Sequence, residues 1–143
     1  MNNILVHAHS GLRWVALILL LLAIVNAFTS STYEKKHRLI NLFAMVSLHT
    51  QLLIGIALLF VSKKVNFDAG WMKLDIFRFY GMEHMAGMIL AIILVTIGHI
   101  KSKKGNTPAE KFKPIKLWYV IGIILILASI PWPFRAELGG SWF

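Results

Sequence analysis

The chain has no cysteine among its 143 residues. Without a thiol it can form neither a disulfide nor an iron–sulfur cluster, and it can hold no haem through a thiolate or a CxxCH site. Acidic residues are also scarce, with six Asp and Glu against fifteen Lys and Arg. The sequence has no phosphate-binding loop, Ser/His/Asp arrangement or carboxylate pair, so hydrolytic and nucleotide chemistry have no support.

Long apolar runs, in contrast, are abundant. Hydrophobic residues make up 57% of the chain and the mean hydropathy is +0.69, which fits a small polytopic membrane protein. Four runs, at about 10–28, 39–61, 76–100 and 115–130, are each long enough to cross about 30 Å of hydrocarbon as a helix. They lack the period-two alternation of barrel strands. We therefore predict an all-α fold, with 1–143 as one integral-membrane domain, a bundle of four transmembrane helices.

The basic residues lie in the breaks between the apolar runs. This position is typical of topology signals and phospholipid contacts, and no nucleic-acid-binding pattern accompanies it. Nine of the fifteen fall in the first and third breaks, and six lie near the termini or in the second break. The positive-inside rule then predicts that both termini lie outside the cytoplasm.

Histidine inside apolar helices is the most informative feature of the chain. His49, His84 and His99 lie in predicted spans, and His9 lies near the outer end of the first. An ionisable side chain in a membrane costs free energy and by default marks a functional site. Because neutral imidazole is a common ligand of metal ions and of haem iron, these four histidines are candidate ligands.

Depth decides which histidines can share one ion. By helix rise, His9 and His84 lie toward the outer boundary, His49 nearer the middle and His99 near the inner boundary. Two axial ligands of one iron must lie at similar depth, so His9 with His84, or His49 with His84, are the credible pairs. His99 with His37 or His49 would form a second, inner site.

Small residues share a face with histidine on the third span. At helical spacing, Gly87 and other small residues lie on the same stripe as His84 and His99. A flat macrocycle ligated by imidazole could lie against this stripe. Close packing of helices, with histidines bonding between them, would use the same residues.

Charged residues near the outer end also have two interpretations each. Arg13 lies one turn from His9 and could bind a haem propionate or a phospholipid phosphate, or simply extend to the interface. Glu83 precedes His84 and could orient an imidazole N–H, or form an ion pair with Arg78 or Arg13.

Four short motifs, HAHSGLRW, HTQLLIG, MEHMAGM and IPWPFR, resemble those of small bacterial four-helix membrane proteins catalogued as cytochrome b. The resemblance covers nearly the whole chain and implies haem b in a bacterial inner (cytoplasmic) membrane. Classical b-type cytochromes carry two histidines on each of two helices, whereas here only the third span has two. This departure favours a single outer haem, with Arg13, Gly87 and Arg135 as candidate contacts of the cofactor.

The resulting expectation is haem b, with copper as the alternative, bound through His84 together with His9 or His49. Such a protein would carry electrons between quinone and another redox protein, or belong to a larger respiratory assembly. Iron with two imidazoles has no open position, so we expect electron carriage and no substrate turnover. A cofactor-free accessory or scaffold subunit and a proton- or solute-conducting bundle are the other interpretations.

Overall fold

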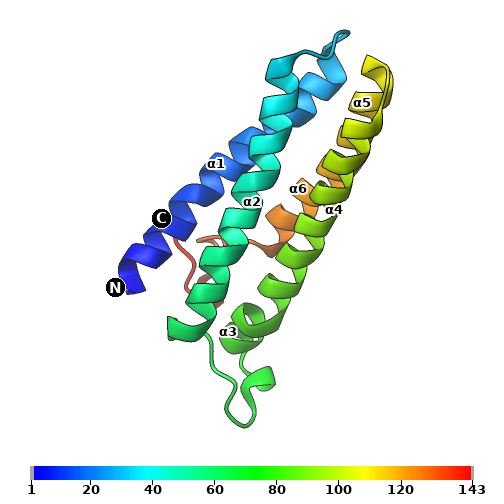
Figure 1. The fold of residues 1–143 in the computed structure, drawn as a ribbon. Helices are drawn as coiled ribbons and strands as arrows, with labels where there is room; N and C mark the ends of the chain where they lie inside the picture. Colours follow the sequence, from blue (N-terminus) through cyan, green and yellow to red (C-terminus); the bar gives the residue numbers. More distant parts are fainter. Residues whose placement is uncertain (1, 143) are drawn as a thin grey trace.

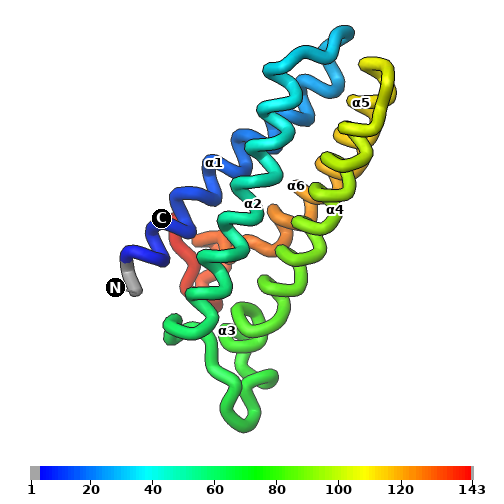
Figure 2. The backbone as a smooth tube through the Cα atoms, viewed as in Figure 1, coloured from blue at the N-terminus to red at the C-terminus, as the bar shows by residue number. Residues whose placement is uncertain are grey.

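The computed structural model describes residues 2–142 and is all-helical over that range. Four helical segments in it are long and apolar enough to cross a membrane, which confirms the predicted fold class: Ile4–Thr29, Lys35–Val61, Asp75–Lys104 and Pro108–Ser129. Successive segments run in opposite directions as two long hairpins (Figure 1). The C-terminal segment folds back between the hairpins and reaches the first helix (Figure 2).

The first hairpin consists of α1 (Asn2–Thr29) and α2 (Lys35–Val61). α1 begins before the predicted start at residue 10, because polar residues end the apolar run without ending the helix. Residues at helical spacing on its inward face are buried, among them Ala16, Leu20, Ala23 and Ala27. At the start of α2, the Glu34 N–H donates to His37 Nδ1 over 3.0 Å and closes a capping box.

The third span is interrupted close to its start. It comprises α3 (Asp75–Arg78), a π-turn η2 (Phe79–Glu83) and α4 (His84–Lys104), after a short turn η1 (Trp71–Lys73). π-turns inside α-helices are rare and occur frequently at functional sites. The π-turn ends at the residue before His84.

The fourth span comprises α5 (Pro108–Pro114), a π-turn η3 (Ile115–Tyr119) and α6 (Val120–Ser129), and a short turn η4 (Ala136–Leu138) follows. It begins earlier than the predicted residue 115. Thr107 caps it by accepting from the Glu110 N–H over 3.2 Å, and proline occupies the first turn. The TPAE sequence therefore carries the true start of this helix.

Glycines let α4 and the fourth span pack closely. A Cβ built on Gly122 would lie 2.6 Å from Val95 Cγ2, and one built on Gly98 would lie 2.7 Å from Trp118 Cβ. Contacts this close leave no room for a side chain. Over this part of the third span, the stripe of small residues allows the helices to pack closely, which is the second of the two interpretations given by the sequence.

Candidate functional site

A cavity of about 430 Å³ lies between the two hairpins. Residues of α1, α2, α4 and α6 line it, and the C-terminal segment contributes Gly140 and Ser141. Its walls are mainly leucine, isoleucine, valine and methionine, with a few polar side chains among them. Such walls are typical of a site for a small molecule or cofactor.

His9 and His84 face this cavity from opposite hairpins. Their ring centroids are 6.3 Å apart, with the ring planes at 70°. Two imidazoles that bind one ion from opposite sides, through metal–nitrogen bonds of about 2 Å, hold their centroids about 6 Å apart. The structure thus brings together one of the two predicted pairs, at a separation suited to one metal ion.

A backbone carbonyl fixes the tautomer of His84. Its Nδ1 lies 2.8 Å from the carbonyl oxygen of Ser129, which can only accept, so Nδ1 carries the proton and donates. Nε2 is left with its lone pair, the form in which imidazole binds metal. Ser129 is the last residue of α6, where helix carbonyls lack intrahelical partners.

Gly87 allows this hydrogen bond to form. A Cβ at Gly87 would collide with the Ser129 hydroxyl and lie 3.1 Å from Ser129 Cβ. Gly87 does not line the cavity, where a macrocycle was expected to lie against it. In the structure its role is to let α4 and α6 pack closely. Its smallness matters because it lets the end of α6 approach His84.

Residues of α2 position His9. The Gln51 side chain donates to the His9 carbonyl over 2.8 Å, and a Cβ on Gly55 would lie 3.6 Å from His9 Cε1. His9 Nδ1 is buried and has no hydrogen-bond partner among residues 2–142. A buried polar atom without a partner costs free energy, so the site fits a ligand that would engage this imidazole.

Aromatic side chains of the π-turn surround His84. The Phe79 and Tyr80 rings lie 5.8 and 6.3 Å from the His84 ring. Phe79 is buried, and the Tyr80 hydroxyl donates to the Leu138 carbonyl over 3.1 Å. The π-turn therefore joins the helix that carries His84 to the folded-back C-terminal segment.

Two cations line the cavity together with the histidines, Arg13 and Lys64. Arg13 Nη2 donates to the Trp142 carbonyl over 2.7 Å, and Lys64 Nζ donates to the Gly139 carbonyl over 2.6 Å. Burial lowers the pKa of Lys64 below its usual value. Arg13 was a predicted site residue, whereas Lys64 was missed because only the folding back of the chain shows its position.

The other candidate histidines lie elsewhere. His49 is exposed on α2, with Nδ1 2.9 Å from the carbonyl of Met45 in its own helix, so the predicted His49–His84 pair does not form. His99 is buried in α4 but does not line the cavity. His37 caps α2, and its Nε2 lies 3.3 Å from Ser30 Oγ. Both of its nitrogens are engaged, so the inner site with His99 is not assembled.

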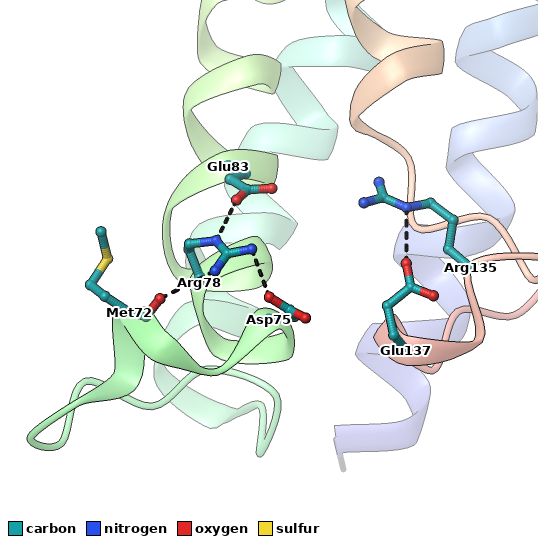
Figure 3. Close-up of polar contacts among 6 residues, drawn as sticks. All are labelled: Met72, Asp75, Arg78, Glu83, Arg135 and Glu137. Carbon is teal, nitrogen blue, oxygen red and sulfur yellow. Dashed lines mark hydrogen bonds and ion pairs between the residues drawn. The ribbon is translucent and has the colours of Figure 1, made fainter.

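Glu83 forms an ion pair, as one of its two sequence interpretations states. Its carboxylate accepts from Arg78 Nε over 2.8 Å, and Arg78 Nη2 donates to Asp75 over 2.7 Å (Figure 3). Arg135 lies across the same small cleft, 3.5 Å from Glu137, with its guanidinium over the Phe79 ring. Arg135, predicted as a cofactor contact, therefore does not reach the cavity.

The set of donor atoms suits a cofactor that brings ligands of its own. Within the described chain, no three His, Cys, Asp or Glu side chains cluster as a metal site. A zinc ion held by protein takes three or four protein ligands, whereas haem iron needs one or two, because the macrocycle supplies the rest. None of the protein-family models, curated proteins or solved structures compared with this chain matches it.

Proposed function

We propose that this chain is a membrane electron carrier similar to b-type cytochromes, with one haem b held between His9 and His84. The observation that carries the proposal is the imidazole pair at 6.3 Å in an apolar cavity. The Ser129 carbonyl supports it by leaving His84 Nε2 free to ligate. When bound, haem supplies reversible one-electron chemistry at its iron.

The residues around the cavity would have three roles in holding and tuning the haem. Ser129 holds the His84 ring in one tautomer, and Gln51 fixes the backbone turn that carries His9. The leucine, isoleucine and methionine walls exclude water, which sets the local dielectric and thereby the reduction potential. A haem held by both His9 and His84 would have no coordination position left for a substrate.

The environment and partners belong to the same proposal. We place the protein in a bacterial inner membrane, surrounded by lipid, with quinone or another redox subunit as its electron partner. The position of His49 supports contact with a further subunit, because its polar ring lies on the exposed face of an apolar helix. The same observation favours the second candidate function, a cofactor-free accessory subunit of a larger complex.

An absorption spectrum of the purified, dithionite-reduced protein tests the proposal. We expect the sharp bands of six-coordinate haem b, with about one haem per chain, because two imidazoles complete the coordination of one iron. Metal analysis of the same sample covers copper as the alternative. A featureless spectrum from a sample without iron or copper would favour the accessory subunit.

The orientation in the membrane is a separate prediction. Nine of the fifteen basic residues lie in the helix ends next to the connections 30–34 and 105–107, and these connections are at the end of the bundle opposite the C-terminal segment (Figure 1). We expect both termini outside the cytoplasm. A reporter that is active only in the cytoplasm should be silent when fused after the last residue and active when inserted at Gly105. The reverse pattern would show that the orientation is wrong.

A further inference from the structure

Arg13 and Lys64 present two positive charges to one cavity, and among residues 2–142 no carboxylate lines it with them. None of the six acidic residues of the chain lines the cavity. Among residues 2–142, neither cation has a carboxylate within ion-pair distance. They donate instead to carbonyl oxygens of the C-terminal segment.

Both cations are partly buried, which adds to the cost of leaving them without an anion. A cation removed from water loses hydration, and carbonyl dipoles compensate for less of that loss than a carboxylate does. The Arg13 Nε is buried and has no partner among the described residues, so one edge of the guanidinium has an N–H to donate. Arginine is suited to bind a carboxylate through two parallel hydrogen bonds.

The two cations and the two histidines line the same cavity. A haem bound between His9 and His84 carries two propionate carboxylates, as many negative charges as there are cations here. We propose that Arg13 and Lys64 bind these two propionates, each exchanging a backbone carbonyl for a carboxylate. This inference rests on the haem-binding function proposed above and adds a residue, Lys64, to the site.

A comparison of haem with its dimethyl ester tests the proposal, because the ester keeps the macrocycle and iron and removes both negative charges. We expect the wild-type protein to bind haem at least about tenfold more tightly than the ester, since charge-assisted hydrogen bonds are about twice as strong as neutral ones. Lys64→Met should lose about tenfold in affinity for haem and little for the ester. Lys64→Arg should restore the preference.

Lys63→Met is the matched control, because Lys63 is the exposed neighbour of Lys64 and does not line the cavity. It should retain the wild-type preference. Binding of the ester by Lys64→Met shows in the same experiment that the variant folds.

Three results would overturn the proposal. Equal affinity of the wild-type protein for haem and ester would remove the propionate role and leave haem binding intact. A second result would assign the cations to a lipid phosphate. In it, the wild-type protein binds haem and ester equally and retains an anionic phospholipid on purification, whereas Lys64→Met does not retain that lipid. Absence of a haem spectrum with either porphyrin would overturn the proposed function and this inference together.

Discussion

In a His84→Ala variant, we expect at least about a tenfold loss of haem content, while the four spans insert and fold as before. The substitution would remove one of the two imidazoles proposed to hold the haem, the one whose Nδ1–H donates to the Ser129 carbonyl. Alanine is compatible with an apolar helix, so insertion does not depend on the imidazole. The ratio of haem absorbance to protein, after purification in detergent, measures the effect.

His49→Ala is the matched control for this experiment. It makes the same substitution in another spanning helix, at a side chain that is exposed and bonded only within its own helix. We expect a full complement of haem there. A full complement in His84→Ala, or an equal loss in both variants, would contradict the assigned site.

Gly87→Ala should disturb the site without touching the cavity. The new methyl group would collide with the Ser129 side chain and push the end of α6 away from His84. The Ser129 carbonyl would then release the imidazole N–H, and loss of such supporting hydrogen bonds typically costs about 10- to 100-fold in metal affinity. We expect weaker haem binding and a shifted reduction potential, measured by titration with haem and by redox titration.

Two further variants isolate the cause of this effect. Gly11→Ala is the control, because a Cβ at Gly11 meets no other atom within 4 Å, and it should behave as the wild type. The double variant Gly87→Ala with Ser129→Gly should recover much of the affinity, because it removes the colliding side chain and keeps the carbonyl. An unchanged potential in Gly87→Ala would show that the Ser129 hydrogen bond does not tune the site.

The sequence predicts the spans and the depth of each histidine, because both follow from helix rise and the thickness of hydrocarbon. Depth left two credible pairs, His9 with His84 and His49 with His84, and the structure brings the first of them together. Depth could not separate the two pairs, since it says nothing about the direction in which a side chain leaves the helix. That direction depends on how α2 packs against its neighbours, which a single apolar helix pattern does not encode.

Other parts of the site leave no signal in a side-chain pattern. The group that fixes His84 is a backbone carbonyl, and every residue has one. Lys64 contacts the folded-back C-terminal segment beside the cavity, through a hydrogen bond between residues 75 positions apart. The start of the fourth span, in contrast, was readable from Thr107 and Glu110, whose spacing is that of a capping box.

Because of the π-turn at Phe79–Glu83, the direction in which His84 points depends on the number of residues in this turn. A π-turn holds one residue more than an α-turn, as if a single residue had been inserted into a regular helix. Loss of that residue would restore a regular helix and rotate everything on one side by about 100° relative to the other. His84 and its aromatic neighbours would then no longer face the same way. Deletion of Gly81, a residue of this turn that has no side chain, would thus disrupt the site while keeping every side chain that builds it.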